Sequence, residues 1–169
     1  CKRCYGIFAQ GNERTYKRGR RTHQGIQGEQ YRLVMRILIV NDDGINAKGI
    51  HLLASWARKL GKVTVVAPKV EQSGKSRGIN IITPFEIKKV DFMTGVEAYS
   101  VDSTPADCVR VGVISIGHDY DLVLSGMNRG FNVGRDIGYS GTAGAIMEAC
   151  GHGYRGGCCR QIPLPLRCW

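Results

Sequence analysis

The sequence predicts an α/β fold in which a mostly parallel sheet carries helices on both faces. Two observations lead to this prediction. Three apolar runs of strand length, at 35–40, 63–68 and 120–126, have the composition of strands that are buried on both faces. Segments with helical periodicity or helix-start signals lie between them, which is the pattern of parallel strands joined by helices. A chain of 169 residues is long enough for one domain with a hydrophobic core.

The first part of this pattern is a strand–helix–strand unit. The run "MRILIV" at 35–40 is the first strand, and "VTVVAP" at 63–68 is the second. The segment between them places five apolar residues on one helical face, namely Ile50, Leu53, Ala54, Ala57 and Leu60. Gly61 is expected to end this helix, because glycine is favoured just past a helix C-terminus. The crossover between the two strands is expected to be right-handed.

Two weaker strands are predicted before the third apolar run. The stretches 79–90 and 96–103 alternate apolar and polar residues, so we expect strands that are antiparallel or lie at an edge. The third buried strand, "YDLVLSG", then follows at 120–126.

Two further helices carry recognisable start signals. Ser103 or Thr104 is expected to cap a helix over 103–117, with a proline in its first turn. Ser140 or Thr142 is expected to cap a helix over 140–150. Together with the three apolar strands, these helices complete a doubly wound α/β pattern.

The net charge of +10 is concentrated in the two flanks of the chain. Residues 1–34 carry eight basic and two acidic side chains, and residues 151–169 carry three basic and no acidic ones. We therefore expect a basic, disordered extension over 1–34, a folded core over 35–150 and an irregular tail over 151–169. Cys1 and Cys4 have zinc-like spacing, but no second pair of that spacing follows, so a metal role for the cysteines is not favoured.

Polar residues follow each of the three apolar strands. The clusters are "NDDG" at 41–44, "PKVEQSGKS" at 68–76 and "SGMN" at 125–128. Because ligands bind past the carboxyl ends of parallel strands, we expect the three clusters to meet at one edge of the sheet.

Asp42 and Asp43 are adjacent carboxylates at this edge. At ~4 Å and an effective dielectric constant of ~20 they would repel each other by about 4 kcal/mol. A divalent cation would relieve the repulsion, and all-oxygen ligands favour Mg²⁺ or Mn²⁺ over zinc. A turn with a helix cap is the alternative, since Asp-Gly is a common turn pair. The positions of Ser73 and Asn128 after the neighbouring strands favour the metal site.

Other polar features admit two interpretations. "SGKS" at 73–76 resembles the end of a P-loop, but Lys69 stands where its first glycine belongs, and a strand pattern follows instead of a helix. Lys75 and Arg77 lie near a phosphate or in a solvated loop. The helix start over 139–144 either cradles a phosphate with its free N–H groups or is simply capped.

The other candidate acid–base groups are one aspartate and three histidines. Asp136 either binds a metal-bound water or acts in proton transfer, or is a surface carboxylate in a loop. His51, His118 and His152 have no partners in the sequence, so we interpret them as structural or exposed and assign no histidine base.

Four motifs, in this order, resemble the SurE survival-protein family over residues 35–149. They are "RILIVNDDGINAKGI", "VVAPKVEQSGKS", "YSVDSTPADCV" and "DLVLSGMNRGFNVGRDIGYSGTAGAIMEA". The resemblance implies a Rossmann-like fold and a divalent-metal-dependent phosphatase that acts on nucleoside 5′- and 3′-monophosphates, with some members also cleaving polyphosphate. It also implies homodimers or tetramers and one Mg²⁺ or Mn²⁺ ion per subunit.

The resemblance also assigns roles to residues of this chain. The implied metal ligands are Asp42, Asp43, Ser73 and Asn128. The implied phosphate-side residues are Asn128, Ser140, Gly141 and Thr142. Asp42 and Asp43 are the implied catalytic residues, and whether water or one of these aspartates attacks phosphorus stays open.

The family pattern stops near residue 150, where a later strand and an oligomer-forming portion are expected but "CGHGYRGGCC" follows. One hypothesis is that translation from upstream of a start at Met35 and a frameshift after Cys150 produced the two flanks. The alternative is two genuine tails. A C-terminally truncated chain would be an active phosphatase or an inactive remnant that binds nucleotide or metal, and a third alternative is a nucleic-acid binder acting through its basic tail. Since no apolar run reaches the ~18 residues of a membrane span, we expect a cytoplasmic protein without a membrane partner.

Overall fold

The computed structural model describes residues 34–117, 119–130 and 133–160. Its strands are β1 (Met35–Val40), β2 (Gly61–Pro68), β3 (Ile87–Lys89), β4 (Glu97–Val101), β5 (Leu122–Asn128) and β6 (Gly156–Arg160). Its helices are α2 (Lys48–Ala57), α3 (Pro105–Arg110), the π-helix η1 (Val111–Ile116), the 3₁₀-helix η2 (Gly134–Gly138) and α4 (Gly141–Gly151). The expectations for residues 1–33, His118 and 161–169 lie outside the described residues.

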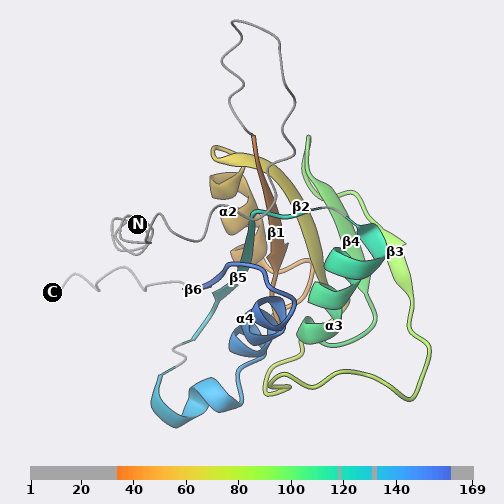
Figure 1. Ribbon diagram of the computed structural model, residues 1–169, viewed down its shortest axis with the longest axis vertical. Coiled ribbons are helices and arrows are strands. Elements are labelled where there is room, and N and C mark those ends of the chain that lie inside the picture. Colours follow the sequence, from red (N-terminus) through yellow and green to blue (C-terminus); the bar gives the residue numbers. More distant parts are fainter. Residues whose placement is uncertain (1–33, 118, 131–132, 161–169) are drawn as a thin grey trace, which may run out of the picture. The chain divides into compact units, whose positions relative to one another are not determined.

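The strands form one six-stranded sheet in the order β3-β4-β2-β1-β5-β6. Every neighbouring pair is parallel except β3 and β4, which are antiparallel. Figure 1 shows β3 and β6 at the two edges and helices on both sides of the sheet. The predicted α/β fold class is therefore confirmed.

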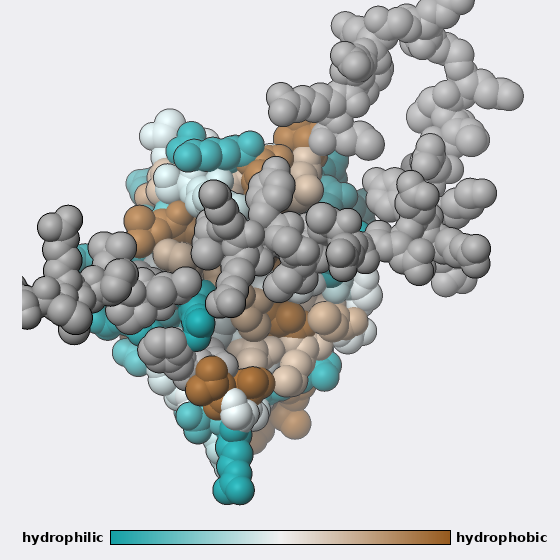
Figure 2. Space-filling model, turned by 90° about the vertical axis from the view of Figure 1, so that its left-hand side faces the viewer, coloured by the Kyte–Doolittle hydropathy of each residue, from teal (hydrophilic) through white to brown (hydrophobic). Residues whose placement is uncertain are grey.

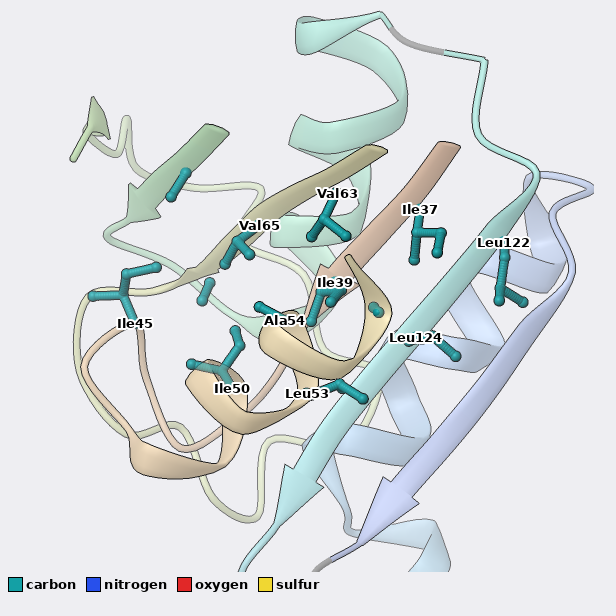
Figure 3. Close-up of a cluster of buried hydrophobic side chains, with 13 residues drawn as sticks. Ile37, Ile39, Ile45, Ile50, Leu53, Ala54, Val63, Val65, Leu122 and Leu124 are labelled. Carbon is teal, nitrogen blue, oxygen red and sulfur yellow. The ribbon is translucent and has the colours of Figure 1, made fainter. Parts of the chain in front are cut away.

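Alternate residues of β1 face opposite sides of the sheet and build two core layers. Ile37 and Ile39 pack with the apolar face of α2, whereas Leu38 and Val40 pack with α3 and α4. None of these four side chains is exposed, and full burial of each stabilises the fold by about 2 kcal/mol. Figure 3 shows the first layer, in which Ile50 and its helical neighbours face the strands.

Two predicted α-helices are shorter than the sequence pattern indicates. Helix α2 ends at Ala57, so Leu60 is exposed and Gly61 is the first residue of β2 instead of a helix terminator. The predicted helix over 103–117 is α-helical only from Pro105 to Arg110 and continues as the π-helix η1. Thr104 caps α3 by accepting a hydrogen bond from an N–H group three residues later, as one of the two predictions had it.

The prediction of a strand over 79–90 is wrong except at β3. The side chain of Asn80 bonds the backbone around it, because its Oδ1 accepts the N–H groups of Ile82 and Thr83 and its Nδ2 donates to the Thr83 carbonyl. This local arrangement replaces a strand ladder, and Ile81 and Ile82 stay exposed. The strand at 97–101, in turn, pairs in parallel with β2 and antiparallel with β3, so it lies inside the sheet.

The segment after residue 150 contains a strand where an irregular tail was expected. Strand β6 pairs in parallel with β5, with Gly156 opposite Val123 and Cys158 opposite Ser125. Its sequence "GGCCR" lacks the β-branched and aromatic residues that mark a strand. A Cβ at Gly156 would lie 2.9 Å from Ile146 of α4, so the absence of a side chain there lets the segment approach the helix.

The order of the strands places a switch point between β1 and β5. The chain runs outward from β1 to β2, forms the edge strand β3, returns to place β4 between β3 and β2, and then crosses to the other side of β1 to form β5 and β6. Ligand sites of doubly wound sheets lie at the carboxyl ends of the strands beside such a point. Asn41, Asp42 and Asp43 follow β1 directly, and Asn128 ends β5.

Two further observations concern the distribution of apolar residues. On the face drawn in Figure 2, apolar and hydrophilic residues are interspersed. Within the described part of the chain, no helix has both the length and the apolar composition needed to cross a membrane.

Candidate functional site

Asp42 is a buried carboxylate that the start of α4 holds in place. Only 3% of Asp42 is exposed, and both of its oxygens accept hydrogen bonds from Thr142. The Thr142 hydroxyl donates to Oδ1 at 2.6 Å and the Thr142 backbone N–H donates to Oδ2 at 3.1 Å. A Cβ at Gly141 would lie 2.8 Å from the Cβ of Asp42, so glycine allows this close approach. The positive end of the α4 dipole thereby faces the carboxylate.

Asn128 presents its carbonyl oxygen to the same place from the end of β5. Its Oδ1 lies 3.3 Å from the Thr142 hydroxyl, whose single proton is also directed at the closer Asp42 oxygen. Its Nδ2 donates to the Gly130 carbonyl at 3.0 Å, which fixes the orientation of the amide. The amide oxygen therefore faces the Asp42–Thr142 pair and retains capacity to accept a further partner.

Asp43 is half-buried and keeps one oxygen without a partner. Its Oδ2 is buried and has no hydrogen-bond partner among the described residues. Burial raises the pKa of Asp43, and the negative charges of Asp42 and Glu71 raise it further. The charge of Arg129 and a hydrogen bond from its backbone act in the opposite direction without cancelling the increase in pKa. The site thus concentrates negative charge beside an unpaired oxygen, a combination that a cation would stabilise.

The loop after β2 lies against the two aspartates. The N–H of Gln72 donates to the carbonyl oxygen of Asp42 at 2.7 Å, and the N–H of Ile45 donates to the carbonyl of Pro68 at 2.8 Å. Ser73 follows in this loop, is exposed, and donates its hydroxyl to Glu71 at 2.7 Å. The structure therefore brings Ser73 to the neighbourhood of the aspartates but directs its hydroxyl at a third carboxylate.

The predicted phosphate cradle at the start of α4 is largely occupied by protein groups. Ser140 is the N-cap, since its hydroxyl accepts the N–H of Ala143 at 3.2 Å and its carbonyl accepts the N–H of Gly144 at 2.9 Å. The N–H of Thr142 is already bound to Asp42. Ser140 thus caps α4 and Thr142 anchors Asp42, and the phosphate-side role of Ser140, Gly141 and Thr142 stays a prediction.

The side-chain atoms at this edge that could bind a metal ion are oxygens. Among the residues that the structure describes, no three His, Cys, Asp or Glu side chains come together as a metal-binding group. Any cation at this edge would instead combine the two aspartates with amide and hydroxyl oxygens, which is the chemistry of Mg²⁺ or Mn²⁺ sites. The unpartnered Oδ2 of Asp43 and the Oδ1 of Asn128 fit such an ion.

Several polar residues lie outside this cluster. His51 stacks on Phe92 with ring centroids 4.0 Å apart, and His152 contacts Glu148 at 3.1 Å, so both histidines have partners outside the cluster. Asp136 is exposed in η2. Arg77 binds Glu148 at 2.8 Å, an ion pair across 71 residues that periodicity and motifs gave no means to find.

Glu71 and Arg129 are two charged neighbours of Asp43 that the sequence analysis did not single out. Both follow strands that end at the site, since Glu71 comes three residues after β2 and Arg129 directly after β5. The rule that ligands gather past strand ends could have identified them.

The family model described as "Survival protein SurE" matches residues 37–159 of this chain. The chain belongs to the SurE family. The match extends ten residues past the motifs recognised in the sequence and includes most of β6.

Proteins named 5′-nucleotidase SurE are similar to this SurE chain. That of Clostridium beijerinckii is 50% identical over 121 residues, which is 70% of this chain and 47% of the relative. That of Thermosipho africanus is 47% identical over 115 residues, or 68% of this chain and 45% of the relative. A crystal structure of the SurE protein from Aquifex aeolicus matches with a TM-score of 0.64 and 41% identity, covering 72% of this chain and 48% of that one. The chain thus spans about half the length of the SurE relatives that it matches.

Proposed function

We propose that this chain is the metal-binding part of a divalent-metal-dependent phosphatase that hydrolyses nucleoside 5′- and 3′-monophosphates to nucleoside and phosphate. The observation that carries the proposal is the oxygen cluster at the β1–β5 switch point. It joins the unpartnered Oδ2 of Asp43 to the Thr142-held carboxylate of Asp42 and the amide oxygen of Asn128. The name 5′-nucleotidase of the similar proteins supports the choice of substrate.

The proposed ligands of one Mg²⁺ or Mn²⁺ ion are Asp42, Asp43, Asn128 and Ser73. A divalent cation at these oxygens would supply positive charge that offsets the charge of the substrate phosphate. Each oxygen of Asp42 accepts one hydrogen bond from Thr142 and retains a lone pair for a second partner. The hydroxyl of Ser73 rotates freely about its Cβ–Oγ bond, so it can turn away from Glu71 and direct a lone pair at a metal ion.

The proposed reaction is displacement at phosphorus by water. The water oxygen forms a bond to phosphorus and the bond from phosphorus to the ester oxygen breaks. The ester oxygen takes up the proton that the water gives up, so the nucleoside leaves as an alcohol. Each oxygen of Asp42 already accepts a hydrogen bond from Thr142, whereas Oδ2 of Asp43 accepts none among the described residues, so we assign Asp43 to orient the attacking water. Positioning and charge stabilisation account for most of the catalysis of phosphoryl transfer.

Phosphate release from nucleoside monophosphates tests the proposal. The full chain should release phosphate with Mg²⁺ or Mn²⁺ and lose this activity in EDTA. Asp43→Asn should abolish release, because the amide removes the negative charge at the site. Asp91→Asn is the matched control, since Asp91 is an exposed carboxylate before β4, at the opposite end of the sheet. Metal-independent release, or full activity of Asp43→Asn, would contradict the proposal.

A further inference from the structure

Glu148 of α4 is a buried carboxylate with three basic partners from different parts of the chain. Its Oε2 accepts from Nε of Arg77 at 2.8 Å, and its Oε1 accepts from Arg110 of α3 at 3.3 Å. Oε1 also lies 3.1 Å from Nε2 of His152. Burial alone would raise the pKa of Glu148, but the hydrogen bonds and charges of these partners outweigh burial and hold the pKa below its usual range. None of these residues contacts Asp42 or Asp43 through a described bond.

The face of α4 around Glu148 is shaped to receive the loop segment Ser76–Arg77. Gly144 and Gly151 stand four residues before and three residues after Glu148, so all three share one face of the helix. A Cβ at Gly144 would lie 2.0 Å from the Ser76 carbonyl oxygen, and one at Gly151 would lie 2.7 Å from Nη2 of Arg77. A side chain at Gly144 would therefore push the backbone of the segment off the helix, whereas one at Gly151 would displace the end of the Arg77 side chain.

Ser76 has a backbone conformation that needs support from its surroundings. Its φ is +53°, in the left-handed region that non-glycine residues seldom adopt. Its N–H donates to the Tyr139 carbonyl at 3.0 Å, and its hydroxyl donates to the Gly138 carbonyl at 2.7 Å. A conformation of this kind persists only where several contacts determine it. The Arg77–Glu148 ion pair is the charged member of that set.

The other end of the same loop is attached to the candidate metal site. Gln72 donates its N–H to the carbonyl of Asp42, and Arg77 binds Glu148, so residues 73–76 span the distance between two anchors, one on Asp42 and one on α4. Four residues reach at most about 14 Å, so little freedom is left to them. Figure 1 shows this loop leaving β2 and passing below the sheet beside α4.

We propose that Glu148 is a positioning residue: by holding Arg77 against α4, it fixes residues 73–75, including the proposed ligand Ser73, beside Asp42 and Asp43. The same helix holds Asp42 through Thr142 at its first turn. Helix α4 therefore holds both the Asp42 carboxylate and the loop in place. The effect on metal affinity rests on the proposed function, whereas the effect on the loop does not.

The test compares Arg77→Gln, Glu148→Gln and their double variant with Arg110→Gln in the full chain. Arg110 is the matched control, since it also binds Glu148 but belongs to α3 and has no described hydrogen bond or ion pair with residues 72–77. Hydrogen–deuterium exchange of the Ser76 amide should be roughly tenfold faster in the first three variants, because a charge-assisted hydrogen bond is lost. The double variant should be no worse than either single one, since both remove the same interaction. Arg110→Gln should exchange at this position as the unsubstituted chain does.

Mn²⁺ binding, followed by the electron paramagnetic resonance signal of the free ion, gives a second readout that needs no turnover. Binding should weaken roughly tenfold in the three loop variants, as is typical when support of a metal ligand is removed, and stay unchanged in Arg110→Gln. The proposal would be overturned if the Ser76 amide exchanged at the same rate in Glu148→Gln as in the unsubstituted chain. It would also be overturned if Arg110→Gln accelerated this exchange as much as the loop variants do. If the unsubstituted chain bound no Mn²⁺, the proposed function would fail, and the exchange comparison would still decide the role of Glu148.

Discussion

Replacing Thr142 with valine should test the hydrogen bond to Asp42 while the shape of the buried side chain stays the same. Valine keeps the branched form of threonine but lacks the hydroxyl that donates to Oδ1 of Asp42 at 2.6 Å. Thr142 is fully buried and Asp42 is 3% exposed, so water does not readily replace the lost donor. The loss of a hydrogen bond to a charged group is worth about 2 kcal/mol. For a domain of this size, that corresponds to a decrease in Tm of about 6 °C.

The assay is thermal unfolding followed by circular dichroism, with and without Mn²⁺. Thr142→Ser is the control, because it keeps the hydroxyl and removes only a methyl group, which should cost about 1 kcal/mol. We expect the valine variant to unfold at the lower temperature and to bind Mn²⁺ roughly tenfold more weakly, since the orientation of Asp42 is lost. A valine variant as stable as the unsubstituted chain, or a serine variant that loses as much, would refute the role of this hydroxyl.

Two further predictions concern α4. Gly144→Ala should lower the free energy of unfolding by about 2 kcal/mol in chemical denaturation, because its Cβ would lie 2.0 Å from the Ser76 carbonyl, as expected for overpacking. Gly138→Ala, whose Cβ would meet nothing within 4 Å, should be close to neutral. Since its partners hold the pKa of Glu148 below its usual value, the carboxylate stabilises the fold above that usual value and loses this contribution as the pH falls through the lowered pKa. The free energy of unfolding of Glu148→Gln should therefore depend less on pH in the acid range. The same pH dependence in Glu148→Gln and in the unsubstituted chain would show that Glu148 is not coupled to folding.

The strands of the core could be predicted from the sequence because burial on both faces dictates their composition. The runs that became β1, β2 and β5 are mostly apolar, and their period places Ile37 and Leu38 on opposite faces. Cap residues were also predictable, since the side chains of Thr104 and Ser140 bond the backbone three residues ahead of each. Local chemistry of this kind is readable without knowledge of the fold.

The failures have equally local reasons or depend on pairing at a distance. Asn80 folds the backbone onto its own side chain, which competes with the strand that alternation predicts. Strand β6 forms through main-chain pairing with β5, although its Gly-Gly-Cys-Cys-Arg sequence has weak strand propensity. The backbone hydrogen bonds of this strand are made with β5, so the sequence of the segment itself gives little indication of a strand.

The candidate site divides in the same way. The convergence of Asp42 and Asn128 follows from strand order, and the structure adds Thr142 as the residue that joins them. The bond from Ser73 to Glu71 and the ion pair from Arg77 to Glu148 depend on loop geometry, which periodicity does not encode. Strand ends therefore identify the place of the site, whereas the side-chain contacts that support it require the structure.

The most direct measurement of the central claim is the stoichiometry and affinity of Mn²⁺ binding, because it needs no substrate. We predict one Mn²⁺ per chain for the unsubstituted protein and for Asp91→Asn. Asp43→Asn should bind at least tenfold more weakly, since it removes a charged ligand that has no other partner for its Oδ2 among the described residues. Unchanged affinity of Asp43→Asn, or no Mn²⁺ binding by the folded, unsubstituted chain, would contradict the assignment of a divalent-metal site to the end of β1.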